Sequence, residues 1–491
     1  MSPRRSSRST TSRASPRCWC SSPGSARSAE RSWPRSSPTR GPRGPRRSSS
    51  GSTSVTDRRR PVDRPRRAAL DVLTAVRVDE AYANLVLPQV LRKHGLAGRD
   101  AALATELASG AIRMRGLYDP VIDACLTRPR LQPEVRDVLR LGTHQLLSMR
   151  VPDHAAISTS VDLVRAAVGR GPSGLVNAVL RTISRRSLDD WIAEVAPDPA
   201  HDPYGHLAVA RSHPRWVVDL LGQALGADAE LDDLLAADNA APRVTLVARP
   251  GLATVEELEA AGGTRTARSP YGVVLDGGDP AAVAAVSEGR AGVQDEGSQL
   301  VALAMSEASL EGRDERWLDL CAGPGGKAAL LAALAARRGA TLVAHERQPH
   351  RAALVAAAVR AAPAGSVSVV AGDGMRPAWV SGTFDRVLVD APCSGLGALR
   401  RRPESRWRRT PEDVDVLVGL QQVLLDGALD AVRPGGIVVY ATCSPVVAET
   451  SEVVDAVVGR RGDTDEVARF QLWPHRDGTD AMFAATLRRR A

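Results

Sequence analysis

The sequence contains no apolar run that approaches the roughly 20 residues of a membrane-spanning helix. It is also poor in cysteine, with six cysteines among 491 residues. The one close pair, Cys18 and Cys20, has a single residue between its members and no second pair elsewhere, so the sequence offers neither a metal-binding spacing nor a disulfide framework. We therefore expect no membrane partner and no metal, and a reducing, cytoplasmic location.

Positive charge is concentrated in one segment of the chain. The net charge is +9, but residues 1–50 carry twelve arginines and one glutamate, a net charge of +11, which leaves −2 for the remainder. Residues 1–60 are rich in Arg, Ser and Pro and have few apolar side chains, so we predict a disordered tail that cannot offset its chain entropy. Nonspecific binding to RNA phosphates is one hypothesis for this tail. The favoured one is a misplaced start site, with initiation near Val55.

Two cysteine motifs each stand at the end of a short apolar run. Residues 390–395 read Asp-Ala-Pro-Cys-Ser-Gly, and residues 440–445 read Tyr-Ala-Thr-Cys-Ser-Pro. Open α/β folds place their chemistry at the carboxyl ends of the strands, so we expect Cys393 and Cys443 at one sheet edge. A free cysteine is most often a buried small side chain. Two thiols at one edge, in a domain that also has a cofactor loop, favour covalent catalysis instead.

A glycine-rich turn occupies residues 319–327, with the sequence Asp-Leu-Cys-Ala-Gly-Pro-Gly-Gly-Lys. It follows the apolar residues 317–318 and precedes the alanine- and leucine-rich residues 328–336, an order typical of strand, turn and helix. Glycines let the backbone approach a ligand, and the amino end of a helix offers N–H groups to an anion. The turn lacks the Gly-x-Gly-x-x-Gly pattern, and alone it is also typical of a simple tight connection.

Acidic residues end three further predicted strands. Glu346, Asp373 and Asp390 each follow an apolar run. An acidic residue at the end of the second strand accepts hydrogen bonds from a ribose diol in folds of this kind. Three acids in succession suit an adenosine-containing ligand across the sheet edge, although helix capping is an alternative for each of them.

Together these motifs resemble those of the RNA 5-methylcytosine methyltransferases, and the resemblance covers roughly residues 62–491. In that family the Thr-Cys-Ser cysteine is the nucleophile, which implies this role for Cys443. The Pro-Cys-Ser-Gly cysteine assists product release, which implies this role for Cys393. The two differently framed cysteines separate the family from the DNA enzymes. The implied cofactor is S-adenosyl-L-methionine.

The resemblance also implies cofactor contacts. The ribose and adenine contacts of the family fall on Glu346 and Asp373, and Asp390 lies beside the methyl donor and the target base. Two positions depart from the family: Gly323 stands where alanine is more usual, and Glu346 where aspartate is common. A glutamate should still bind a diol. The family's cofactor loop matches Cys321, Ala322, Gly323, Pro324, Gly325, Gly326 and Lys327.

Three folded domains are expected, in a chain long enough to hold them. Residues 61–187 show apolar side chains at helical spacing and predict an all-α bundle similar to the family's NusB-like RNA-binding domain. Residues 188–290 predict a small α+β connector, and residues 291–491 an α/β Rossmann-like methyltransferase domain that uses S-adenosylmethionine. The NusB-like resemblance depends on residues 105–107, 152–157 and 174–181.

A basic loop, residues 400–409, lies between the two cysteine motifs and contains one tryptophan. A run of charge is usually a solvated face, but this one adjoins the proposed site, and an indole can stack on a base. Residues 212–216 are a weaker candidate for RNA contact, and a helix start packed by Trp216 is the favoured interpretation. The predicted RNA contacts are Arg400, Arg401, Arg402, Arg406 and Trp407.

The predicted function is methylation of C5 of a cytosine in 16S ribosomal RNA by a monomeric enzyme. A thiolate that adds to C6 of cytosine turns C5 into a nucleophile able to take a methyl group, and the C5 proton and the thiolate leave afterwards. One alternative is a transfer RNA cytosine-5 methyltransferase, which shares all of this chemistry. The other is a non-catalytic RNA-binding factor for assembly or transcription.

Overall fold

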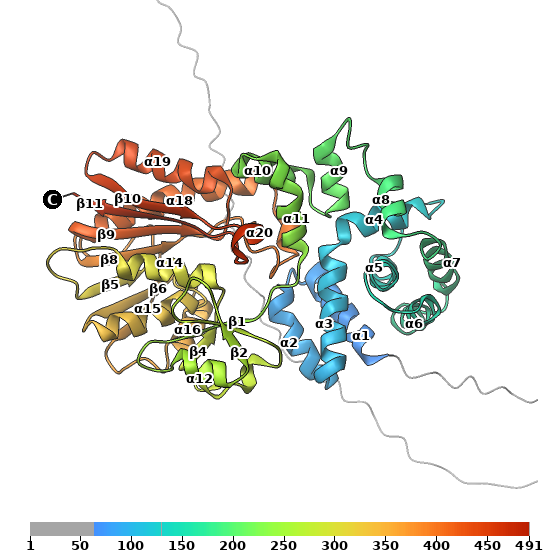
Figure 1. Ribbon diagram of the computed structural model, residues 1–491, viewed down its shortest axis with the longest axis horizontal. Helices are drawn as coiled ribbons and strands as arrows, with labels where there is room; N and C mark the ends of the chain where they lie inside the picture. The colour runs from blue at the N-terminus through green and yellow to red at the C-terminus, as the bar shows by residue number, and fades with distance from the viewer. Residues whose placement is uncertain (1–62, 129, 491) are drawn as a thin grey trace, which may run out of the picture. The chain divides into compact units, whose positions relative to one another are not determined.

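The computed structural model describes residues 63–128 and 130–490 (Figure 1). The predicted tail, residues 1–60, and the start-site hypothesis lie outside the described residues. Within the described ranges, no helix combines the length and apolar character needed to cross a bilayer. The same ranges contain no group of three or more His, Cys, Asp and Glu side chains arranged to hold a metal ion.

The amino-terminal domain is the predicted all-α bundle, built around one apolar core. Helix α1 begins at Asp63, whose carboxylate accepts a hydrogen bond from the backbone N–H of Arg66 at 3.0 Å and so caps the helix. Its apolar residues recur at helical spacing, so that Ala69, Leu70 and Leu73 face the core. The helices are α1 (Arg64–Val78), α2 (Ala83–His94), α3 (Gly98–Arg113), α4 (Arg115–Ala124), α5 (Pro133–Leu147), α6 (Asp153–Ala167), α7 (Ser173–Ile183), α8 (Leu188–Val195) and α9 (Pro203–Ala210).

The core of the bundle extends past the predicted boundary at residue 187. Trp191 on α8 is buried within this core, and its indole N–H donates to the backbone oxygen of Ile183 at 3.0 Å. The apolar core is therefore continuous across residue 187 and does not mark a domain boundary there. The division into domains stays a prediction.

The connector combines short helices with a small antiparallel sheet. The sheet has the strand order β2-β3-β1-β4. This mixture of helices and short strands agrees with the predicted α+β connector, and Trp216 packs at the start of α10 as interpreted from the sequence. The elements are α10 (Arg215–Leu225), η1 (Asp228–Glu230), α11 (Leu231–Asn239), β1 (Thr245–Ala248), α12 (Val255–Ala260), β2 (Gly263–Arg265), β3 (Gly272–Leu275), η2 (Pro280–Ala282), α13 (Ala284–Ser287) and β4 (Ala291–Val293).

The carboxyl-terminal domain is the predicted α/β domain. Helix α14 begins at Glu296, because the Asp295 carboxylate accepts from the backbone N–H of Gly297 at 2.9 Å and caps the helix there. The elements are α14 (Glu296–Glu307), β5 (Arg316–Asp319), α15 (Gly326–Arg337), β6 (Thr341–Glu346), α16 (Pro349–Ala358), β7 (Val367–Ala371), β8 (Phe384–Asp390), α17 (Ser405–Arg408), α18 (Pro411–Ala431), β9 (Val432–Thr442), η3 (Val447–Glu449), α19 (Ser451–Arg460), β10 (Thr464–Gln471), α20 (Pro474–Asp477) and β11 (Phe483–Arg489).

The large sheet has the strand order β10-β11-β9-β8-β5-β6-β7, in which β5 to β9 run parallel and β11 lies antiparallel to β9. Helices α14, α15 and α16 cover one face, and α18 and α19 cover the other (Figure 1). The central strands are buried on both faces, which explains why they read as short apolar runs. The chain order reverses between β5 and β8, where open α/β sheets bind their ligands.

The basic loop of residues 400–409 contacts both other domains. The indole N–H of Trp407 donates to the backbone oxygen of Ile112 at 3.0 Å, and its ring packs against the bundle core. Arg406 is fully buried, and its guanidinium donates to the backbone oxygen of Ser212 at 3.0 Å. In this fold Arg406 therefore has no exposed surface with which to contact RNA, and Trp407 makes contacts within the protein.

Replacing Trp407 tests this interpretation. Trp407→Ala should lower the free energy of unfolding by about 3 kcal/mol because it removes a packed aromatic ring. The control Trp407→Phe keeps a ring and loses only the indole hydrogen bond, and should cost about 1 kcal/mol. Urea unfolding followed by circular dichroism measures both. The RNA affinity of Trp407→Phe should match that of the wild type, and a selective loss of RNA binding would instead favour the base stacking predicted from the sequence.

Candidate active site

The two cysteine motifs meet at the carboxyl edge of the large sheet. Strands β8 and β9 pair in parallel with Asp390 opposite Ala441, so the loops that follow them start at the same level. The Sγ atoms of Cys393 and Cys443 are 3.4 Å apart. The expectation that both thiols share one sheet edge is confirmed.

A buried polar network holds the two cysteine loops together. The carboxylate of Glu449, which is fully buried, accepts from the backbone N–H of Ser394 at 2.7 Å and also from its hydroxyl. The hydroxyls of Ser394 and Ser444 are 3.1 Å apart. The side chain of Gln421 donates to Glu449 at 3.1 Å, and the Tyr440 hydroxyl donates to the Glu449 backbone oxygen at 2.7 Å. No motif marks Glu449 in the sequence, and the one visible signal is the serine after each cysteine.

The surroundings make the two thiols unequal. The hydrogen bond from Cys393 lowers the pKa of Cys443, and the charges of Arg402 and Lys327 act in the same direction against burial. The same hydrogen bond, together with burial and the nearby Glu449, raises the pKa of Cys393 well above its usual value. Cys443 is therefore the more acidic thiol of the pair, and Cys393 the less acidic one.

An ion pair lies beside the thiols. The ammonium nitrogen of Lys327 is 2.9 Å from Oδ2 of Asp390, and both side chains are largely buried. Burial alone would lower the pKa of Lys327, but the contact with Asp390 outweighs it and the pKa is raised. Lys327 is thus a permanent cation that fixes the orientation of Asp390 at the end of β8.

The glycine turn between β5 and α15 has a backbone that larger residues could not adopt. Gly325 has φ +112°, and a Cβ atom there would lie 2.6 Å from Cβ of Ala358. Only glycine fits this position. The turn leads directly into the amino end of α15, so it forms a backbone-lined cradle suited to an anionic group.

The two departures from the family pattern compensate for each other. A Cβ atom at Gly323 would lie 2.0 Å from Oε2 of Glu346. Instead, that oxygen accepts from the backbone N–H of Gly323 at 3.1 Å, and Oε1 accepts from the backbone N–H of Gln348 at 3.0 Å. The longer acid therefore reaches into the space that an alanine methyl group would need, and it ties the end of β6 to the cradle.

Two more carboxylates belong to this edge of the sheet. Asp319 ends β5 and is fully buried, and among the residues that the structure describes neither of its carboxylate oxygens has a hydrogen-bond partner. Burial raises the pKa of Asp319 to about 8, with a further contribution from Asp390. Asp373 follows β7 and accepts from the backbone N–H of Met375 at 3.1 Å. A buried carboxyl group without a partner is costly, so Asp319 suits a ligand with donor groups, although it is not among the predicted contacts.

These residues fit S-adenosyl-L-methionine. The cradle can take its carboxylate, and the acids at the ends of β5, β6 and β7 can face its ammonium, ribose and adenine groups. Cys321 is not a third reactive thiol, because burial raises its pKa well above the usual value. The individual cofactor contacts stay predictions.

The predicted RNA contacts at the start of the basic loop differ in their partners. Arg400 lies 3.2 Å and Arg401 3.0 Å from carboxylate oxygens of Asp480. Arg402 makes no ion pair or side-chain hydrogen bond with the described residues, and its guanidinium lies 5.5 Å from the ring centre of Tyr82. Among these three arginines, Arg402 is the one whose guanidinium N–H groups are not used in an ion pair, so it is the strongest candidate for RNA contact. The RNA contacts of Arg400 and Arg401 stay predictions.

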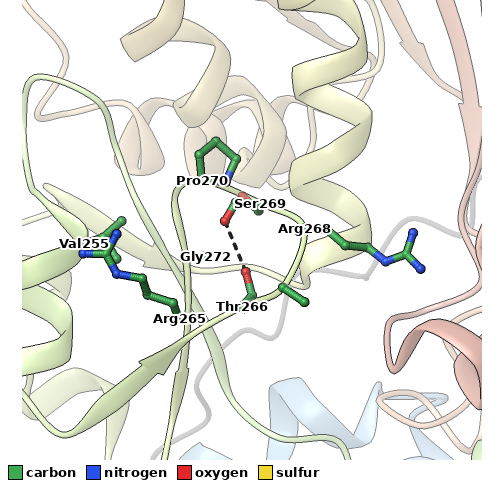
Figure 2. Close-up of a pocket in the computed structure, with 8 residues that line it drawn as sticks. Val255, Arg265, Thr266, Arg268, Ser269, Pro270 and Gly272 are labelled. Carbon is green, nitrogen blue, oxygen red and sulfur yellow. Dashed lines mark hydrogen bonds between the residues drawn. The ribbon is translucent and has the colours of Figure 1, made fainter.

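A surface cavity of about 220 Å³ lies in the connector and is separate from the thiols (Figure 2). Figure 2 shows Arg265 and Arg268 pointing away from each other, and their guanidinium groups pair with Glu256 and Asp477. The cavity thus presents no unpaired charge to a ligand. It is lined by Val255, Arg265, Thr266, Ala267, Arg268, Ser269, Pro270 and Gly272.

The compensation between Gly323 and Glu346 can be tested by a double-mutant cycle. Gly323→Ala should weaken binding of S-adenosylmethionine about fivefold, because Glu346 must move and lose its bond to the loop. Glu346→Asp should weaken it similarly, because the shorter acid cannot reach. The double variant should bind nearly as well as the wild type, with a coupling of about 2 kcal/mol measured by titration calorimetry. Simple additivity of the two losses would contradict the compensation.

Comparison with known families matches two parts of this chain. Residues 309–488 match the family described as 16S rRNA methyltransferase RsmB/F. Residues 63–185 match the NusB family, in agreement with the helical bundle.

Individual relatives match along most of their length. A Mycobacterium tuberculosis protein named as a methyltransferase is 51% identical over 451 residues, which cover 88% of this chain and 98% of that protein. Ribosomal RNA small subunit methyltransferase B of Erwinia tasmaniensis is 32% identical over 442 residues, with 86% and 97% covered. The crystal structure of PH0851 shares the fold, with a TM-score of 0.73 at 21% identity over 87% of this chain and 99% of that one. The chain therefore belongs to the 16S rRNA methyltransferase RsmB/F family and is an RNA methyltransferase that depends on S-adenosyl-L-methionine.

Proposed function

We propose that the protein transfers a methyl group to C5 of a cytosine in 16S ribosomal RNA through a transient bond between Cys443 and C6. The observation that carries this proposal is the thiol pair, with Sγ atoms 3.4 Å apart beside the glycine cradle. The name of the matched family and that of the Erwinia relative support small-subunit ribosomal RNA as the substrate.

Cys443 is the nucleophile. Its lowered pKa supplies a thiolate, and the positive charges of Lys327 and Arg402 stabilise it. Addition of this thiolate to C6 gives C5 the character of a carbanion. The bound cofactor supplies an electrophilic methyl group. The target base must leave its stack to reach the sulfur, as bases do in other base-modifying enzymes.

Asp390 holds the target base. Its Oδ2 atom is bound to Lys327 at 2.9 Å, which leaves Oδ1 to accept a hydrogen bond from the exocyclic amine of the cytosine. This bond fixes the base in the orientation in which Cys443 can reach C6. Asp390 therefore orients the base, and Lys327 orients Asp390.

Cys393 completes the reaction, either directly or through a water molecule that it orients. The first cause of its raised pKa is the hydrogen bond to Cys443. When Cys443 is bonded to C6, neither its hydrogen bond nor its charge raises this pKa any longer, and only burial and Glu449 still do. Cys393 can then pass its proton to solvent water and accept the one from C5. Loss of the C5 proton expels Cys443 from C6 and regenerates the thiolate.

The alternatives from the sequence differ in substrate or in activity. A transfer RNA cytosine-5 methyltransferase would use the same site, and the match of residues 63–185 to the NusB family shifts the choice toward the ribosome. Complete cysteine and cofactor motifs argue against a non-catalytic factor. The monomeric state and the cytoplasmic location remain predictions.

Replacing the nucleophile tests the proposal most directly. Cys443→Ala should abolish transfer of radiolabelled methyl groups to unmodified 16S ribosomal RNA, because no thiolate remains to activate C5. Its affinity for S-adenosylmethionine should stay within about twofold of the wild type, since the residue lies outside the cradle. Methylation by Cys443→Ala at the wild-type rate would refute the covalent step.

Replacing the second thiol should block a later step. Cys393→Ala should accumulate a covalent protein–RNA adduct, because methylation proceeds but release of Cys443 does not. Denaturing gel electrophoresis with labelled RNA detects the adduct, and the Cys443→Ala/Cys393→Ala double variant is the negative control. If the single variant at position 443 formed the adduct instead, the roles of the two cysteines would be exchanged.

A further inference from the structure

Arg402 differs from the other arginines of the basic loop. Arg400 and Arg401 are paired with Asp480, and Arg406 is fully buried against backbone acceptors. Arg408 donates to the backbone oxygen of Val76 at 3.3 Å. Arg402 has no such partner among the described residues, and its side chain is partly exposed. Arg409 likewise has no side-chain partner among the described residues, so Arg402 is set apart by its place beside Tyr82 and near Cys443.

The loop brings this guanidinium to the thiolate. The backbone N–H of Gly397 donates to the backbone oxygen of Cys443 at 2.9 Å, so the start of the loop is bonded to the peptide of the nucleophile itself. The charge of Arg402 is close enough to Cys443 to help lower its pKa. Arg402 is thus a cation near the reacting sulfur. It makes no ion pair with the described residues, although its charge also acts on the buried carboxyl group of Glu404.

The helical domain fixes the other side of Arg402. Tyr82 lies between α1 and α2, is 40% exposed, and has the guanidinium of Arg402 5.5 Å and that of Arg408 5.2 Å from its ring centre. Next to it, the backbone N–H of Ala83 donates to the buried carboxylate of Glu404 at 3.3 Å. Cation–π contacts of this kind orient a guanidinium without using its N–H donors. Those donors stay available for a ligand.

We propose that Arg402 binds a backbone phosphate of the RNA strand next to the target cytosine, with Tyr82 of the helical domain holding its guanidinium in position. The inference rests on the proposed function, because it requires RNA at this site. An arginine fork matches two phosphate oxygens, and a base bonded to Cys443 carries its own phosphates into the same neighbourhood. Arg406 and Trp407 act as positioning residues, since they anchor the loop that carries Arg402.

Binding to unmodified 16S RNA transcribed in vitro tests the phosphate contact. The measurement uses the full chain in a Cys443→Ala background, so no methyl transfer or adduct contributes. Arg402→Gln should weaken RNA binding about fivefold. The negative slope of log affinity against log salt should become shallower by about 0.7, because one contact with a single-strand phosphate is lost. Arg402→Lys should keep the slope. Arg409→Gln makes the same charge change in the same loop and should leave the slope near that of the parent.

A second readout needs neither RNA nor turnover. With Cys443 present, the pH profile of its alkylation by iodoacetamide should shift to higher pH in Arg402→Gln and stay in place in Arg409→Gln, because only Arg402 lies beside the thiolate. Tyr82→Ala leaves the loop sequence unchanged and should weaken RNA binding about threefold by releasing the guanidinium. Thermal unfolding and cofactor affinity serve as checks on folding.

Two results would overturn the proposal. One is an Arg402→Gln variant whose salt slope equals that of the parent protein. The other is an Arg409→Gln variant indistinguishable from Arg402→Gln, which would mean that the loop acts through its total charge. Failure of the methylation itself is a separate result, because both assays work without methyl transfer.

Discussion

The parallel pairing of β8 with β9 is the constraint on which the site depends. It sets Asp390 opposite Ala441, so the two following loops leave the sheet at one level and their sulfurs come within 3.4 Å. The buried carboxylate of Glu449 then bonds the loop of Cys393, and the serine after each cysteine joins the two loops. A shift of this register would separate the thiols and leave the Glu449 carboxylate buried without partners.

The chemical difference between the thiols comes first from the hydrogen bond between them, and charges on other elements add to it. The charge of Asp390 acts in the opposite direction on Cys443. The amino end of α15 contributes Lys327, and the basic loop contributes Arg402, both on the side of Cys443. Glu449 lies on the side of Cys393. Because charges at short range act strongly in a buried site, this distribution favours the thiolate on one sulfur and the proton on the other. The loop that carries Arg402 packs against the helical domain, so the position of this charge beside Cys443 depends on that domain.

Much of the fold was predictable because the relevant signals are local. The apolar run before Asp373 forms β7, and the glycine turn leads into α15 as expected. Short apolar runs, a glycine that needs a positive φ and an acid at a strand end all act through neighbouring residues. The exact start of α14 was less predictable. It is set by the hydrogen bond that the N–H of Gly297 donates to the Asp295 carboxylate, which exists only in the folded chain.

The sequence by itself determined the strand ends, the cofactor turn and the two cysteine motifs, because backbone preference and residue chemistry suffice to specify them. Only the tertiary structure decided the roles within residues 400–409. There, a run of similar basic residues separates into ion-paired, buried and uncommitted side chains according to which distant elements surround each one, with Arg406 buried and Arg402 beside Cys443. Burial and charge pairing depend on contacts far apart in the chain, and residue type alone does not carry that information.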